Sequence, residues 1–87
     1  MIVGISELES ETILLYPNPM TDRAYLEFED SSTRTIRLVD SMGKVVRIWE
    51  NNSTQRLEVK REGLANGNYI IQVSGMKQEF NLKLVLN

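Results

Sequence analysis

Residues 64–73 have the sequence LANGNYIIQV, and this stretch does most to decide the fold. Asn66 and Gly67 form a strong turn dipeptide, and a strand pattern follows them. Tyr69 stands at the start of that strand, a position from which a tyrosine in sandwich domains often donates its hydroxyl to the backbone a few residues upstream. We therefore expect a tyrosine corner, with Leu64 plugging the core beneath it; ordinary core packing of Tyr69 is the alternative.

Apolar and polar side chains alternate with a period of two on both sides of this stretch. The alternation predicts strands, because successive side chains of a strand point to opposite faces of the sheet. No segment has a convincing helical period. The seven predicted strands are residues 12–16, 24–29, 35–40, 44–50, 55–60, 68–74 and 78–86.

Seven short strands separated by turn signals predict an all-β protein, a seven-stranded antiparallel β-sandwich. The turn between two of them contains Gly43, which can supply the positive φ of a tight hairpin, so residues 40–44 are predicted to form a hairpin corner. Residues 16–19, YPNP, form a different kind of connection. Each proline restricts the residue before it to extended conformations and cannot donate to a β-ladder, so we expect a stiff elbow that ends the first strand at a sheet edge.

Composition excludes several functional classes. The chain has 87 residues, one small domain, and a formal net charge of −2 without a basic run, which argues against nucleic-acid or anionic-membrane partners. No apolar stretch is long enough for a transmembrane helix. Because cysteine and histidine are both absent, disulfides, thiolate metal sites and the usual catalytic triads are excluded. We expect no enzymatic activity, no metal and no cofactor.

Two aromatic residues support a binding function as an alternative. Within residues 44–50, the alternation puts Val46 and Ile48 on one face and Trp49 on the opposite one. Trp49 and Tyr25 could then form a platform on which a sugar or a protein stacks, as in a stand-alone fibronectin-like module of a secreted protein. Partial burial of Trp49 against the core is the other interpretation.

The motifs also occur in a characteristic order. LLYPNP, AYLEF, IRLVDSMGKVV, GLANGNYIIQV and KLVL follow one another from residue 12 to residue 87. This order resembles the type A C-terminal sorting domain of the type IX (Por) secretion system of Gram-negative bacteria. Residues 1–11 resemble the linker that precedes such a domain, so we expect 1–11 to be a linker remnant and 12–87 the sorting domain.

The resemblance implies an immunoglobulin-like sandwich that acts as a transport signal. Such a domain follows an N-terminally fused cargo that reaches the periplasm, and it directs that cargo across the outer membrane. Its implied partners are the type IX translocon and shuttle proteins and a sortase-like peptidase, which removes the domain and exchanges it for a surface anchor. The implied location is the cell surface or the medium.

Site residues follow from the same resemblance. The tail most directly recognised by the translocon would be Lys83, Leu84, Val85, Leu86 and Asn87. The motif residues that hold the fold would be Pro17, Asn18, Pro19, Gly43, Leu64, Gly67 and Tyr69. If the last strand lies at a sheet edge, its free N–H and C=O groups could accept a strand from a receptor. Deletion of residues 83–87 would then abolish export and leave most of the sandwich folded.

Overall fold

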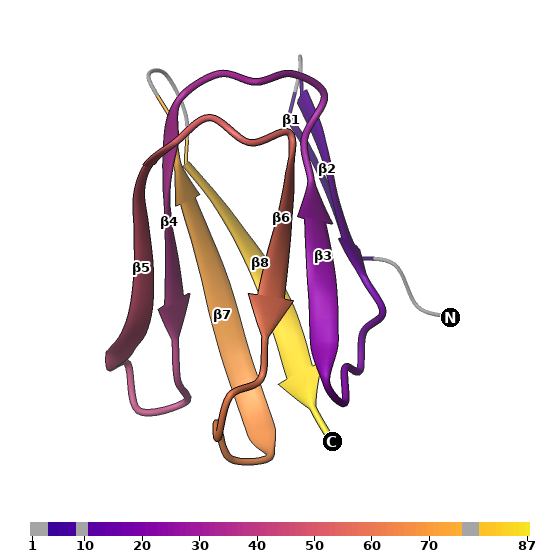
Figure 1. Ribbon diagram of the computed structural model, residues 1–87, viewed down its shortest axis with the longest axis vertical. Coiled ribbons are helices and arrows are strands. Elements are labelled where there is room, and N and C mark those ends of the chain that lie inside the picture. Colours follow the sequence, from indigo (N-terminus) through magenta and orange to yellow (C-terminus); the bar gives the residue numbers. More distant parts are fainter. Residues whose placement is uncertain (1–3, 9–10, 76–78) are drawn as a thin grey trace.

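The computed structural model describes residues 4–8, 11–75 and 79–87, which form two four-stranded antiparallel sheets packed face to face (Figure 1). Sheet A has the strand order β1-β2-β3-β6, and sheet B has the order β5-β4-β7-β8. This part of the chain holds no helix long and apolar enough to cross a membrane. The strands are β1 (Gly4–Leu8), β2 (Glu11–Tyr16), β3 (Arg23–Glu27), β4 (Arg34–Val39), β5 (Val45–Asn52), β6 (Arg56–Lys60), β7 (Gly67–Ser74) and β8 (Glu79–Leu86).

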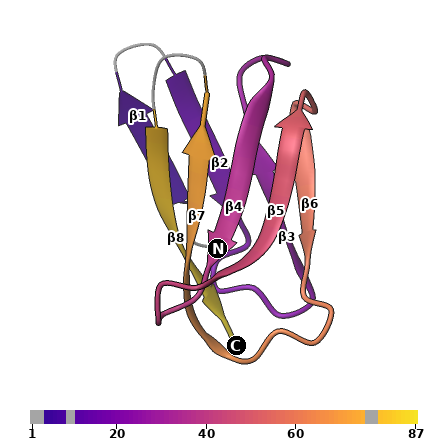
Figure 2. The ribbon, with the colours of Figure 1, turned by 90° about the vertical axis from the view of Figure 1, so that its left-hand side faces the viewer.

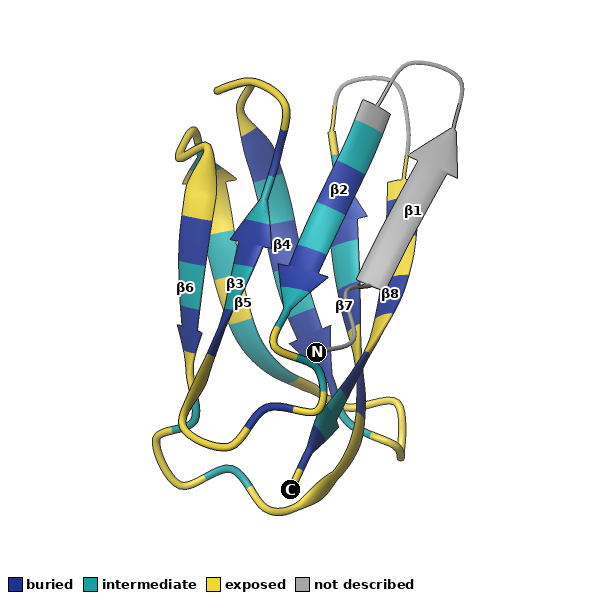
Figure 3. Cartoon of the chain, turned by 90° about the vertical axis from the view of Figure 1, so that its right-hand side faces the viewer, coloured by how far each residue is buried: buried dark blue, intermediate teal, exposed yellow. Residues whose placement is uncertain are grey.

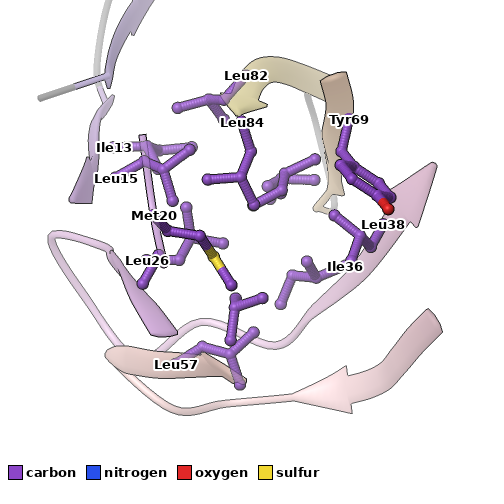
Figure 4. Close-up of a cluster of buried hydrophobic side chains, with 14 of the residues drawn as sticks. Ile13, Leu15, Met20, Leu26, Ile36, Leu38, Leu57, Tyr69, Leu82 and Leu84 are labelled. Atoms are coloured by element: carbon purple, nitrogen blue, oxygen red, sulfur yellow. The ribbon is translucent and has the colours of Figure 1, made fainter. Parts of the chain in front are cut away.

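A single apolar core fills the space between the sheets, because every other side chain of most strands points inward. From β8, Leu82 and Leu84 point toward Ile13 and Leu15 of β2 (Figure 4). The predicted sandwich and the seven predicted strands, which correspond to β2–β8, are confirmed. The other core residues are Met20, Ala24, Leu26, Phe28, Ile36, Leu38, Leu57, Val59, Tyr69, Ile71, Val73, Phe80 and Leu86.

The N-terminal segment differs from its prediction. Residues 4–8 form β1, which pairs antiparallel with β2 from Gly4 opposite Leu15 to Leu8 opposite Glu11. A linker is therefore the wrong description of these five residues. Since β1 and β3 flank β2, the prediction that the strand before the YPNP elbow lies at an edge is also wrong.

Strand β5 departs from regular alternation. Val39 of β4 pairs with Val45, whereas Leu38 pairs with Arg47, so Val46 is an extra residue in the ladder. Such a bulge shifts the facing of the strand by one residue. Val46 and Trp49 consequently both pack against the core and Ile48 points outward, which corrects the predicted grouping of Val46 with Ile48.

Two turns match their predictions. The β4–β5 hairpin is closed by hydrogen bonds between Asp40 and Lys44, and Gly43 has a φ of 86° there. In the other turn, the Tyr69 hydroxyl donates to the carbonyl oxygen of Ala65 at 2.7 Å, which is the expected tyrosine corner. Leu64 is partly buried and packs against the core cluster, as predicted.

Candidate functional site

The predicted recognition tail is residues 83–87; residues 83–86 form the end of β8, an edge strand of sheet B, and Asn87 follows it. Its side chains divide into two sets, as the alternating colours of β8 show in Figure 3. Leu84 and Leu86 are buried in the core, whereas Lys83 and Asn87 are exposed and Val85 is half-buried. In the folded domain, therefore, only three of the five tail side chains are accessible to a partner.

Asn18, the central residue of the PNP motif, closes part of the outer edge of β8. Its side-chain nitrogen donates to the carbonyl oxygen of Lys83 at 2.7 Å, and its Oδ1 accepts from the amide of Val85 at 2.9 Å. One amide side chain thus satisfies both a donor and an acceptor of an edge strand, in the way a neighbouring strand would. The sequence separation of the partners is 65 and 67 residues, so no local pattern could have indicated this contact.

The backbone of Met20 binds the next groups along the outer edge of β8. Its amide donates to the carbonyl oxygen of Val85 at 2.8 Å, and its carbonyl oxygen accepts from the amide of Asn87 at 2.9 Å. These bonds make a short parallel bridge between Met20 and Leu86, and β1 lies beside β8 as well. The edge position of the last strand is confirmed, but the expectation that the N–H and C=O groups of residues 83–87 are free for strand addition is wrong.

Arg61 ties the same segments together and was not singled out from the sequence. Its guanidinium donates to the carbonyl oxygens of Asn87 (2.7 Å), Thr21 (3.1 Å) and Leu64 (2.9 Å), and also to the side chain of Asn66. The Arg61 guanidinium therefore links Asn87, the segment after the PNP motif and the tyrosine corner by hydrogen bonds. The planar guanidinium suits this role because its N–H groups point in fixed directions.

The remaining motif residues occupy turns. Pro17 and Pro19 are exposed and flank Asn18, and the peptide bonds that precede both prolines are cis. Gly67 lies at the start of β7 with a φ of 149°, next to the tyrosine corner. These placements agree with the fold-holding role expected for the motif. The role of the tail in recognition and the role of the motif in holding the fold stay predictions.

The proposed aromatic platform is not formed. Tyr25 lies on the outer face of sheet A, where its ring contacts Tyr16 (centroids 5.9 Å apart) and is covered by the guanidinium of Arg56 at 4.0 Å. Trp49 belongs to sheet B and packs partly against the core. The two rings are therefore not neighbours, and the structure gives no support to a shared binding surface.

Asp30 and Arg34 form a second polar cluster in the loop between β3 and β4. The buried Arg34 lies over the ring of Phe28 at 4.0 Å and pairs with the carboxylate of Asp30 at 2.7 Å. Hydrogen bonds from Ser32, together with Arg34, lower the pKa of Asp30. The cluster anchors a loop and lies apart from the tail. Among the described residues, no group of three or more acidic side chains is placed to hold a metal ion.

Comparison with solved structures finds the same fold elsewhere. PorZ, a bacterial surface component of the type IX secretion system of Porphyromonas gingivalis, superposes with a TM-score of 0.73 and 17% identity over 86% of this chain. The chain spans only 11% of the length of PorZ. A DUF3244 family protein from Bacteroides vulgatus, with an immunoglobulin-like β-sandwich fold, gives a TM-score of 0.71 and 16% identity over 97% of this chain and 98% of that one.

Comparison at the level of sequence is more specific. No curated protein matches the chain. The family model described as "Secretion system C-terminal sorting domain" matches residues 14–87, which include β3–β8, the PNP motif and the tail. The chain therefore belongs to the secretion system C-terminal sorting domain family, and it is a type IX secretion signal of the kind its motifs indicated.

Proposed function

We propose that this domain directs an N-terminally attached cargo protein through the type IX machinery, and that the machinery recognises the tail while it is folded as β8. Family membership accounts for export across the outer membrane to the cell surface or the medium. The observation that carries the finer proposal is the anchoring of the tail: Asn18, Met20 and Arg61 bind its backbone, and Leu84 and Leu86 are buried. A partner that meets the folded domain contacts the outward side chains of Lys83, Val85 and Asn87.

Removal of the domain after export, by a sortase-like peptidase that attaches a surface anchor, belongs to the same proposal. The relevant cleavage would fall between the cargo and β1, the first strand of the sandwich. The domain itself acts without catalysis, as a folded recognition element. Its partners are then the translocon and shuttle proteins at the outer membrane.

The burial of the two leucines decides how this proposal is tested. Loss of a buried leucine side chain costs about 2–5 kcal/mol, and a small domain has only about 5–15 kcal/mol of total stability. Deletion of residues 83–87 would therefore be expected to unfold the domain, contrary to the prediction that most of the sandwich stays folded. Surface substitutions test recognition more cleanly.

The experiment is to fuse a reporter to the N-terminus of the domain and measure its export in a bacterium with a type IX system. Lys83→Glu is the test variant, and Lys60→Glu, an exposed lysine on β6 of sheet A, is the matched control. We expect Lys83→Glu to lower export while its melting temperature stays near that of the control. Equal export of both variants would contradict recognition through the folded tail.

A further inference from the structure

The outer faces of the two sheets carry different kinds of side chain. On sheet A the outward-facing polar groups pair with one another: Arg23 with Glu58 at 3.0 Å, and the Tyr16 hydroxyl with Glu27 at 2.5 Å. On the sheet B side, several large apolar side chains face solvent. Their exposed fractions are 41% for Val45, 49% for Ile48, 36% for Ile70 and 88% for Met42 in the adjoining hairpin.

These side chains gather because the strand register aligns them. Val45 pairs with Val39, Val39 with Ile70, and Ile70 with Lys83, so one row crosses β5, β4, β7 and β8. Figure 2 shows these strands side by side in the order β8, β7, β4, β5. Paired residues project to the same face at a spacing of about 5 Å, which makes a row roughly 15 Å long.

The burial of Val39 shows that the side chains of this row pack against one another. It is only 8% exposed although it is absent from the core cluster, and its neighbour Leu38 points into the core. By alternation Val39 faces outward, so the neighbouring outer-face side chains cover it. An apolar row this continuous on a small monomeric domain typically marks an interaction surface.

The charges next to the row indicate the chemistry of its partner. Lys83 is the last residue of the row. Arg37 lies on the same face of β4, two residues before Val39, and pairs with Ile48 and Gln72. The carboxylates on this face lie toward the other end of the strands: Glu79 is opposite Ser74, about 13 Å along β7 from Ile70, and Glu50 is two residues beyond Ile48 on β5. A partner surface with apolar side chains and nearby carboxylates would complement this face. A second copy of the chain would bring more lysine and arginine to it.

We infer that Val39, Val45, Ile48 and Ile70, together with Arg37 and Lys83, form a docking surface for an acidic-rimmed apolar surface of a protein of the secretion machinery. This inference rests on the proposed function and extends the recognised region from the tail across all of sheet B. The bulge at Val46 contributes directly, because the extra residue lets Val45 and Ile48, three positions apart, face the same side of the sheet.

The test uses the reporter fusion and two pairs of matched variants. Ile48→Thr/Ile70→Thr removes apolar surface while keeping β-branched side chains, and Leu14→Thr removes apolar surface from the outer face of sheet A. Arg37→Glu reverses a charge beside the row, and Lys60→Glu does so on sheet A. We expect roughly tenfold lower export for the sheet B variants, as for the loss of central interface contacts, and unchanged export for the controls. Melting temperatures of the purified domains exclude unfolding as the cause.

The outcomes separate the two proposals. If the unmodified fusion is not exported, the proposed function itself fails. If the unmodified fusion is exported and the sheet B variants match their controls, only the docking surface is refuted. Analytical ultracentrifugation tests whether a second copy of the chain covers this face instead. If the unmodified domain is a dimer and Ile48→Thr/Ile70→Thr is a monomer, a second copy covers the face and the inference is overturned.

Discussion

Asn18→Leu removes the side-chain amide that holds two backbone groups of the tail. The variant loses the bonds to the Lys83 carbonyl oxygen and the Val85 amide, at 2.7 and 2.9 Å, while keeping a side chain of similar size. Each such bond contributes about 0.5–1.5 kcal/mol, so the expected loss in the free energy of unfolding is about 1–3 kcal/mol. For a domain of this size, that lowers Tm by roughly 5–20 °C.

Two measurements check this prediction. Urea denaturation followed by the fluorescence of Trp49, the single tryptophan, gives the change in the free energy of unfolding. Hydrogen exchange then locates the change, because the Val85 amide loses its acceptor and should exchange faster. Asn81→Leu, at an exposed asparagine of the same strand, is the control. A denaturation midpoint equal to that of the control, with unchanged Val85 exchange, would refute the role given to Asn18.

Three further predictions concern the fold. Tyr69→Phe removes the hydroxyl that donates to Ala65 and should cost about 0.5–1.5 kcal/mol in urea denaturation. Leu84→Ala leaves a cavity in the core and should cost about 2–5 kcal/mol, whereas Lys83→Ala next to it should have little effect. Because the pKa of Asp30 is lowered in the folded state, its contribution to stability is present above its ordinary pKa of about 3.9 and is lost as the pH falls through the folded value. Thermal melts of Asp30→Asn should therefore show a weaker loss of stability below about pH 4 than melts of the unmodified domain.

Most of the fold was predictable because its strands follow local rules. Period-two alternation found β2–β8, and the turn residues around Gly43 and Tyr69 specified a hairpin and a corner that the structure contains. β1 was missed because the segment was interpreted from its resemblance to a linker, although its pairing partner β2 was recognised. The grouping of Val46 with Ile48 was wrong because a bulge inserts one residue without a distinct sequence signal.

The candidate site was less predictable, because its contacts join distant parts of the chain. The motif resemblance pointed to both the PNP segment and the tail, but no spacing showed that Asn18 binds the tail backbone. Arg61 was not singled out because its contacts with Thr21 and Asn87 are 40 and 26 residues away in the sequence, and only the fold brings them together. The surface on sheet B arises in the same way, since strand order and register place Val45, Ile70 and Lys83 in one row.

A disulfide that holds the tail in the sheet tests whether the secretion machinery recognises the tail in its folded form. The native chain has no cysteine, and Asn68 and Val85 are paired on β7 and β8. The Val85 backbone groups bond to Asn18 and Met20, so this is a non-hydrogen-bonded pair toward β7, with Cα atoms about 4.5 Å apart and within reach of a disulfide. Asn68→Cys/Val85→Cys would lock the tail onto β7 in the oxidising periplasm. If the folded tail is recognised, the oxidised double variant is exported as well as the single variants; export of the single variants alone would show that the tail must leave the sheet to be recognised.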